Sequence, residues 1–548
     1  MILLLCSLLW AEEKNHTTVI QEELERNLSE LGLPNQERPY YIGAYTVSDE
    51  VSYAKARFGA LMENINSQKN RLYVDLRVGS SVFDNRNFDG GFATSKTGTL
   101  LPSDASPALY QKKLWLLCDQ AYKGAIEEFS EKKAAYSNLD THIGIDFLPI
   151  KVEQDNRSRS IELRDLSPLV TRLSRYSPKG WEDLNVSVMD RKRDIHFLST
   201  EKSDIQKTER YSVLHLHGVR KTADGSDVVG HRWWVAPSPR EFPTEEGVRQ
   251  EMTRLKDWLL ELQKAPVEED YLGPVLFEPA AAAEFFRQLL PKQISGSPPK
   301  SEAPNEWGGT SPVSAAREGR RIFDGNWNVE DLPQKQGLLG SYQFDYEGVK
   351  AQNMTLIKKG VVHDLLMSRT PRKGKTKSTG HGRGGFTSRT TAMPSNVLVT
   401  PPKRYKMAKI RKKAIKMSRQ AGNKYVLVVR VLTPLELDDS LEIAFSGDSP
   451  LSGLSKPLEM VRLYENGTEE AVRSGEFFGV DRRILRDIVM AGPQSSWIHM
   501  IDAPPSDFRA NNQFVGYGTS WSAPAILISE MELRGSKGGE KHRIPEPE

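Results

Sequence analysis

Two histidines that are one residue apart form the most suggestive pair of possible metal ligands in the sequence. His215 and His217 end the strand-like run Tyr211–His217, and residues i and i+2 of a strand point to the same face of a sheet. His231 follows a plausible hairpin. A catalytic zinc needs about three protein ligands, and the spacing identifies no third one. Two interpretations therefore stay open: a metal site on His215 and His217, or histidines that are packed or solvated.

A pair of carboxylates could perform acid–base chemistry. Asp345 and Glu347 are separated by one residue in the segment FDYEG, so both could face one substrate. The alternative is a turn that is held by hydrogen bonds to these side chains. His363 and His499 show no ligand spacing in the sequence.

The segment Ser378–Gly385 reads STGHGRGG and is rich in glycine. It lacks the GKS or GKT ending of a phosphate-binding loop, and it does not clearly follow a strand. We therefore interpret it as a flexible turn and not as a nucleotide site.

Basic residues are concentrated in one part of the chain. The net charge is only +3, yet the segment from Arg369 to Arg419 contains sixteen Lys or Arg residues and no Asp or Glu. Its second part, Pro402–Ala421, predicts an amphipathic helix. The apolar stripe of that helix comprises Met407, Ile410, Ala414, Met417 and Ala421. The alternatives are a solvated helix, a surface for an acidic partner subunit, or one for nucleic acid or an anionic membrane. Few aromatic residues and no DNA-binding motif count against nucleic acid.

The elements that must position these residues fall into two groups along the chain. Before Lys264 the pattern predicts an antiparallel sheet and long helices, of which Ser106–Tyr136 has Ser106 as its cap and Pro107 at its first position. The other predicted helices are Gln21–Leu31, Leu166–Ser177 and Thr244–Gln263. The predicted strands are Pro39–Ser48, Val51–Leu61, Arg71–Val82, Asn185–Asp190, Asp194–Leu198, Tyr211–Arg220 and Arg232–Ala236.

The second half of the chain is predicted to be rich in β-structure. Pro291–Ala316 is rich in Pro, Ser and Gly and predicts a long surface loop. Short strands such as Tyr425–Leu432, Leu458–Tyr464 and Ala525–Leu533 favour a sandwich or barrel-like unit. The fold class is therefore α+β. We expect an N-terminal mixed α/β domain over residues 19–265, a β-rich domain over 266–534 and a disordered tail over 535–548.

The N-terminal residues 1–11 resemble a short signal peptide, with an apolar run from Ile2 to Trp10 and a small residue, Ala11, after it. This predicts a periplasmic or exported protein. The segment has no Lys or Arg before the apolar run, so a cytoplasmic protein is the alternative. No segment reaches the roughly 18 apolar residues of a transmembrane helix. Two cysteines, Cys6 and Cys118, exclude a disulfide scaffold and a cysteine-rich zinc module.

Four blocks of sequence, in order, resemble the TldD/PmbA family, whose TldD-type members are metallopeptidases. They are GPVLFEPAAAAEFFRQLL (Gly273–Leu290), the stretch Ser341–Arg369, the turn Ser378–Gly385 and SAPAILISEMELRG (Ser522–Gly535). The segments Arg57–Leu61 and Lys113–Ala125 also fit a divergent branch. The resemblance covers most of the chain and implies the fold of that family.

The metal-binding residues of the family are absent at the matching place. In TldD-type members a central helix carries HExxxH, whose histidines bind zinc and whose Glu acts as general base, and a later Cys completes the site. Here Glu278 is preceded by Phe277, and Ala282 stands at the second histidine position. No Cys follows Cys118. Glu278 is thus either a remaining catalytic carboxylate or a residue that favours a helix start before Pro279.

The resemblance is to the PmbA (TldE) branch, which lacks HExxxH and pairs with a TldD-type catalytic subunit. It implies no cofactor in this chain, zinc in the partner and an unfolded peptide as substrate. By the same resemblance, His381 and Arg383 would contact the peptide. Homodimerisation is the alternative to such a partner. The rival functions are an active hydrolase with a relocated metal site at His215 and His217, and an exported binding protein without activity.

Overall fold

The computed structural model describes most of the chain. The described residues are 15–89, 94–137, 145–177, 183–223, 225–298, 301–302, 316–372, 374–384, 386, 389–434, 454–473, 475–502 and 516–535. The predicted signal peptide lies outside these residues, as does the predicted tail after residue 535. Among the helices of the described parts, none combines the length and the apolar character needed to cross a membrane.

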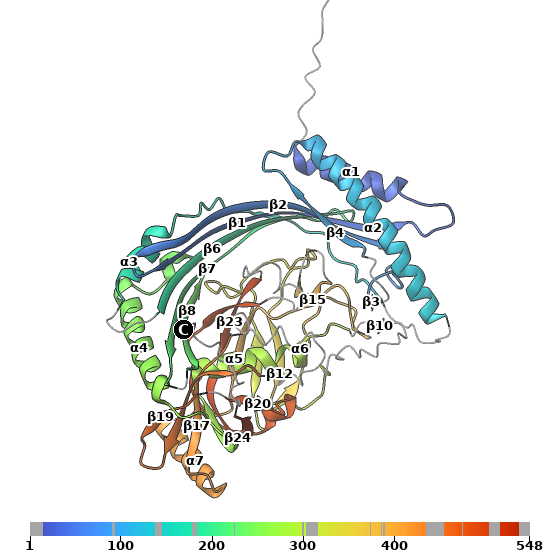
Figure 1. The fold of residues 1–548 in the computed structure, drawn as a ribbon. Helices are drawn as coiled ribbons and strands as arrows, with labels where there is room; N and C mark the ends of the chain where they lie inside the picture. Colours follow the sequence, from blue (N-terminus) through green and yellow to red (C-terminus); the bar gives the residue numbers. More distant parts are fainter. Residues whose placement is uncertain are drawn as a thin grey trace, which may run out of the picture.

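A large curved sheet forms the N-terminal half and arches over the C-terminal half (Figure 1). Its strand order is β4-β2-β1-β6-β7-β5, and β8 also pairs with β7. All pairs are antiparallel except β5 with β7. The strands are β1 (Pro39–Arg57), β2 (Ala60–Val78), β4 (Lys96–Leu101), β5 (Gln154–Arg157), β6 (Asp183–Ser199), β7 (Asp204–Lys221) and β8 (Asp227–Ala236).

The antiparallel sheet is confirmed, but its strands are longer than predicted. The predicted strand Val51–Leu61 is not a separate element, because β1 continues to Arg57 and turns at Phe58 and Gly59, both at positive φ. Likewise, Asn185–Asp190 and Asp194–Leu198 are two parts of β6. The charged residues between them do not end the strand, because Arg191 and Arg193 form buried ion pairs with Asp49 of β1.

Helices cover the convex face of the sheet at its two ends (Figure 1). At one end, α1 (His16–Glu30) and α2 (Pro107–Tyr136) pack on apolar residues of β1 and β2. At the other end, α3 (Ser167–Arg175) and α4 (Glu245–Lys264) pack on β6, β7 and β8. As predicted, the Ser106 hydroxyl caps α2 by accepting from the Leu109 N–H, and Pro107 is its first residue.

Two further sheets form the β-rich C-terminal half. One has the order β19-β18-β17-β9-β24-β20 with β21 paired to β24, and the other has the order β13-β12-β11-β16-β23-β22. The first contains β9 (Tyr271–Phe277), β17 (Tyr425–Leu432), β18 (Pro457–Tyr464), β19 (Glu469–Ala471), β20 (Glu476–Phe478), β21 (Ile488–Gln494) and β24 (Pro524–Arg534). The second contains β11 (Asn328–Asp331), β12 (Met354–Lys358), β13 (Val361–Val362), β16 (Asn396–Thr400), β22 (Ile498–Asp502) and β23 (Tyr517–Ser522).

One helix joins these two sheets, and another helix covers the first of them. The helix α5 (Pro279–Leu289) contacts β17 and β24 of the first sheet and β23 of the second. The basic helix α7 (Met407–Gln420) packs on β9, β17 and β21 through Ile410 and Ala414. Residues of α4, α7, β9 and β17 share one hydrophobic cluster, so the two halves of the chain are in apolar contact. The division at residue 265 stays a prediction.

The prediction that Pro291–Ala316 forms a surface loop is partly wrong. The first residues of the segment form the short helix α6 (Pro291–Ile294), and Ile294 is fully buried in the C-terminal core because it is an apolar anchor in a polar segment. Ser301–Glu302 forms β10, which pairs in parallel with β3 (Phe88–Asp89). Most of the remaining residues of this segment lie outside the described ranges. With these corrections the molecule is an α+β protein, as the sequence predicts.

Candidate functional site

The start of α5 is the place where the family resemblance puts a metal. The buried strand β9 runs directly into the helix, and Pro279 is its first residue, as predicted. Glu278 precedes it, and its N–H donates to the carbonyl of Val429. The Glu278 carboxylate makes no capping bond to the helix. It accepts instead from Nη2 of Arg411 in α7 at 2.9 Å, so this candidate catalytic carboxylate is held in an ion pair.

The residues that flank Glu278 do not fit a zinc ion. Phe277 and Ala282, at the two positions where relatives have histidine, are fully buried. The Phe277 ring lies 5.1 Å from the Phe285 ring and 5.7 Å from the Phe477 ring, centroid to centroid. Phenyl and methyl groups have no lone pair for a metal, and a catalytic zinc needs about three protein ligands.

A buried ion-pair network lies farther along α5. Arg287 Nε donates to Asp502 Oδ1 at 2.6 Å, and Nη1 donates to both oxygens of Glu284. Its Nη2 donates to the carbonyl of Ile501, while Asp502 Oδ2 accepts from the Thr519 hydroxyl. This network was not predicted from the sequence, although Glu284 and Arg287 at i and i+3 in a mostly apolar helix were a visible signal.

Asp345 and Glu347 form a turn that is closed by hydrogen bonds. Asp345 Oδ1 accepts from the N–H groups of Glu347 and Val349, and Oδ2 accepts from the N–H of Gly382. Glu347 accepts from the N–H of Arg369. Burial raises the pKa of Asp345 to about 7, and the charge of Glu347 adds to that rise. This geometry matches the second of the two alternatives, a turn that is held by hydrogen bonds to the two side chains.

The glycine-rich turn is buried, in contrast to the flexible turn that the sequence predicts. It contains β14 (Gly382–Arg383), which pairs with β15 (Thr391–Ala392). His381 is fully buried, with Nδ1 at 3.0 Å from the Thr379 carbonyl oxygen and Nε2 at 3.5 Å from Asp331 Oδ2. Burial lowers the pKa of His381. The glycines permit this packing, since a Cβ at Gly382 would lie 2.4 Å from Glu347 Oε2.

Arg383 lies between this turn and the concave face of the large sheet. Its guanidinium carbon is 4.6 Å from the ring centroid of Tyr342 and 4.0 Å from that of Tyr517. On the sheet side, Lys207 and Glu209 of β7 approach Tyr346, and the Tyr346 hydroxyl donates to Glu209 at 2.8 Å. These neighbours were not predicted from the sequence, because Tyr517, Lys207 and Glu209 lie more than a hundred residues from Arg383 along the chain.

Three histidines of the large sheet, His215, His217 and His231, come together on β7 and β8. His215 Nε2 lies 2.9 Å from His231 Nδ1, and the rings of His217 and His231 are 4.9 Å apart. Burial lowers the pKa of His215 to about 3 and that of His231 to about 4; the charges of His231 and His217 add to the shift of His215, and those of His217 and Arg232 add to the shift of His231. The structure thus brings His231 to the predicted pair. Even so, no group of three or more His, Cys, Asp or Glu side chains in the described residues is arranged to hold a metal ion.

A sequence profile of the PmbA/TldA metallopeptidase C-terminal domain matches residues 270–535, the half that contains α5, both carboxylates of the turn and Arg383. The C-terminal half of the chain belongs to the TldD/PmbA family. A metalloprotease from Methanothermobacter thermautotrophicus is 26% identical over 227 residues, which are 41% of this chain and 48% of that protein. The match therefore spans about half the length of that relative.

Solved structures of similar proteins support the TldD/PmbA fold over nearly the whole chain. TldE from Thermococcus kodakarensis has a TM-score of 0.61 at 12% identity, covering 95% of this chain and 100% of its own. The other two similar structures are of proteins described as candidate modulators of DNA gyrase. The one from Thermotoga maritima has a TM-score of 0.59 at 14% identity and covers 90% and 96% of the two chains. The one from Bacteroides thetaiotaomicron has a TM-score of 0.55 at 11% identity and covers 95% of this chain and 99% of its own. At these identities the likeness shows the fold alone.

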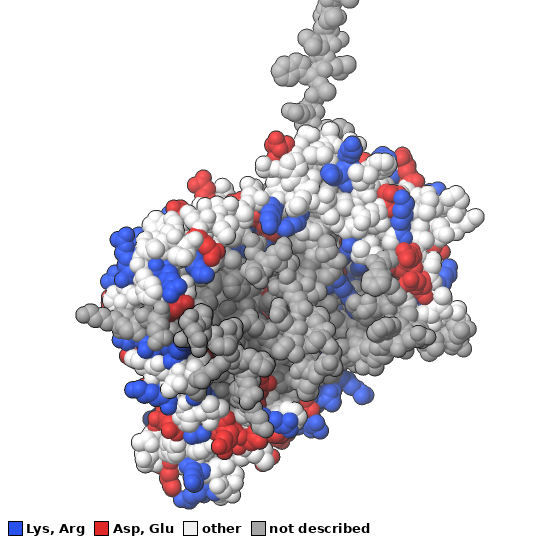
Figure 2. All heavy atoms as spheres, viewed as in Figure 1, with Lys and Arg blue, Asp and Glu red and all other residues white. Residues whose placement is uncertain are grey.

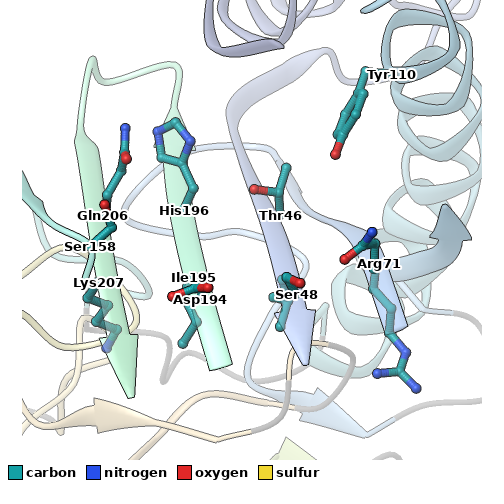
Figure 3. A pocket seen from close by; sticks show the side chains of 12 residues that line it. Thr46, Ser48, Arg71, Tyr110, Ser158, Asp194, Ile195, His196, Gln206 and Lys207 are labelled. Carbon is teal, nitrogen blue, oxygen red and sulfur yellow. The ribbon is translucent and has the colours of Figure 1, made fainter. Parts of the chain in front are cut away.

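A cavity lies on the convex face of the large sheet, and Lys207 is among the residues that line it (Figure 3). It has a volume of about 130 Å³. Its polar lining includes Thr46, Ser48, Asn70, Tyr110, Asp194, His196 and Gln206. His196 Nε2 is bonded to Asp204 Oδ1 at 2.7 Å, so the one imidazole in this lining is already engaged.

The basic segment Arg369–Arg419 does not form one patch. Arg369 is fully buried and makes a bidentate ion pair with Glu201. On α7, Arg411 pairs with Glu278 and Glu469. Figure 2 shows basic and acidic side chains interspersed over the described residues of the visible face. Acidic side chains from other parts of the chain thus pair with Arg369, Lys375, Arg411 and Arg419 of this segment.

Proposed function

We propose that this chain is a metal-free subunit of a two-chain peptidase, in which it shapes a peptide cleft and a TldD-type partner supplies the zinc. One observation carries the proposal. The helix that would hold the metal has buried Phe277 and Ala282 where ligands would be needed, and its carboxylates Glu278 and Glu284 are held by Arg411 and Arg287. Such a helix start can serve as a wall of a cleft but offers no water-activating ion.

An open strand edge supports the presence of a partner chain. Among the described residues β2 pairs with β4 only from Asn70 onward, so the outer edge of β2 from Ala60 to Lys69 has no strand beside it. The residues at this end of the hairpin include exposed apolar side chains. They are Phe58, Leu61, Met62 and Ile65, which are 44–57% exposed. A long apolar edge of this kind is a template for pairing with another chain.

The first experiment measures metal and activity with and without a partner. The purified chain should contain far less than one equivalent of zinc by elemental analysis and should not cleave an unfolded peptide. Mixed with a TldD-type chain from the same organism, it should co-purify and support cleavage. One tightly bound metal per isolated chain, or cleavage by the isolated chain, would contradict the proposal.

The second experiment tests the edge of β2. The double variant Met62→Glu, Ile65→Glu should lose the partner in co-purification, because charges oppose burial of that edge. The matched control is Leu33→Glu, an exposed apolar residue in the connection from α1 to β1, which should retain the partner. Both variants should keep the thermal midpoint of the native chain. Equal recovery of the partner with both variants would remove this edge from the interface.

A further inference from the structure

Arg383 is a buried cation without a carboxylate partner. Its side chain is 3% exposed, and no Asp or Glu oxygen among the described residues lies within 4.0 Å of its guanidinium. Its one hydrogen bond in these residues is from Nη1 to the carbonyl of Gly518 at 3.3 Å. A guanidinium has five N–H donors, and an unpaired buried charge is strongly destabilising. Such a group calls for an anion from outside the described chain.

The surroundings of Arg383 define the direction from which an anion can approach. Tyr342 and Tyr517 stack against the guanidinium, and aromatic rings occupy the faces of this planar group. The N–H donors lie in its plane, at the edge that the rings leave open. Two parallel N–H donors match the two oxygens of a carboxylate. The hydroxyl of Tyr517 is also buried without a hydrogen-bond partner, and it adds one more donor beside the same guanidinium.

A second buried cation lies near Arg383. It is Lys207, with Nζ 4.1 Å from the Tyr346 ring centroid and 3.3 Å from Glu209 Oε1. Arg383 and Lys207 therefore share Glu209 as their nearest acid. Asp345 and Glu347 are also near, but their oxygens accept backbone N–H groups of their own turn. On the same face Asp49 forms ion pairs with three arginines, namely Arg71, Arg191 and Arg193.

We propose that Arg383, assisted by Lys207 and the Tyr517 hydroxyl, binds a carboxylate of the peptide. The inference rests on the proposed peptide cleft and names the group by which the peptide is recognised. A single carboxylate supplies one negative charge, and the Arg383 guanidinium has no acid within 4.0 Å among the described residues. It also supplies two coplanar oxygens, which match the open edge of the guanidinium. Both a C-terminal carboxylate and an Asp or Glu side chain have this chemistry.

The binding experiment compares three peptides on the purified chain by isothermal titration calorimetry. The probes are an acetylated Gly-Ser-Ala-Gly-Leu peptide with a free carboxylate, the same peptide as an amide, and an amide in which Ala is replaced by Glu. We expect the amide without Glu to bind about tenfold or more weakly than the free acid, since a charged hydrogen-bonded pair is lost. The Glu-containing amide distinguishes a side-chain carboxylate from a terminal one.

Variants assign the effect to Arg383. Arg383→Met should abolish the difference between free acid and amide, and Arg383→Lys should retain part of it. Tyr517→Phe should reduce the difference. Arg419→Met, at an exposed arginine of α7 that pairs with Glu465, should leave it unchanged. If Arg383→Met does not fold, the Tyr517→Phe variant and the native comparison decide.

Two results would overturn the inference: equal affinity of the native chain for all three peptides, or an undiminished preference for the acid in folded Arg383→Met. These results are distinguishable from a failure of the proposed function. A chain that binds the free acid but recovers no zinc-bearing partner keeps the carboxylate site and refutes the subunit role. A chain that supports cleavage with a partner but shows no preference for a carboxylate keeps the subunit role and refutes the carboxylate site.

Discussion

Arg287 Nε lies 2.6 Å from Oδ1 of Asp502, and this contact joins α5 to the end of β22 inside the C-terminal core. Both side chains are buried, as is Glu284, the second acid that Arg287 binds. The helix α5, which the family resemblance aligns with a zinc-binding helix, is therefore attached to the second sheet by a guanidinium and two carboxylates. This network defines the position of α5 without any metal ligand.

Arg287→Met should reduce the free energy of unfolding by about 3–5 kcal/mol, because it removes the buried cation that Glu284 and Asp502 share. Denaturation by urea measures the loss. Arg419→Met removes an exposed ion pair with Glu465 and should change the free energy by about 0.5 kcal/mol or less. A loss as small as that of the control would mean that water or backbone groups compensate both acids.

Gly382→Ala should destabilise the protein although alanine is only one methyl group larger. The new Cβ would lie 2.4 Å from Glu347 Oε2 and 3.0 Å from Asp345 Oδ2, which have no free space to move into. Overpacking of this kind costs about 1–3 kcal/mol. Gly247→Ala is the control, since its Cβ in the first turn of α4 would have no contact closer than 3.4 Å. Thermal and urea denaturation of the two variants should therefore differ clearly.

The sequence predicts the helices and most strands well because their signals are local. The cap of α2, the start of α4 after Thr244 and the bounds of β17 follow from residues within one or two turns or one alternating run. The predicted strand lengths are wrong where charged residues continue a strand. Arg191 and Arg193 look like strand ends in the sequence, but Asp49 from a strand about 140 residues away neutralises them.

The surroundings of the candidate residues could not be predicted in the same way. The sequence identifies Arg383 and Asp345 as candidates, but whether each is exposed depends on the large sheet that closes over them. Tyr517 and Lys207, which meet Arg383, come from opposite halves of the chain. The ion pair of Glu278 with Arg411 likewise needs the packing of α7 against β9. Contacts across such separations leave no local pattern.

Arg383→Met should be at least as stable as the native chain when no ligand is present. The native guanidinium is buried with no carboxylate beside it in the described residues, so an uncharged side chain of similar length removes a desolvation cost. Arg193→Met should have the opposite effect, because it removes a partner of the buried Asp49. Thermal midpoints in the absence of peptide compare the two. A strongly destabilised Arg383→Met would show that the charge is compensated within the protein.

Asp345 should make the native state less stable as the pH rises from about 4 to about 7. Burial raises its pKa to about 7 in the folded protein, whereas an unfolded aspartate has a pKa near 3.9. The folded state thus binds the proton more tightly, so this contribution is complete below about pH 4 and is lost through pH 7. In Asp345→Asn the fall between pH 5 and pH 8 should be smaller by on the order of 2 kcal/mol. Asp104→Asn, at an exposed position before α2, should show the native pH dependence.

The histidine cluster should act in the opposite direction, with stability lost as the pH falls. Burial, with a contribution from neighbouring positive charges, lowers the pKa of His215 to about 3 and that of His231 to about 4, while an unfolded histidine has a pKa near 6.5. The unfolded chain therefore takes up protons first, so the native state is fully favoured above about pH 6.5 and loses stability toward pH 4. In His231→Gln the loss between pH 7 and pH 5 should be smaller by on the order of 1 kcal/mol, because glutamine takes up no proton in either state. Urea midpoints at the two pH values measure this, with the exposed His363→Gln as control. An identical pH dependence for both variants would mean that the cluster is already open to water in the native state.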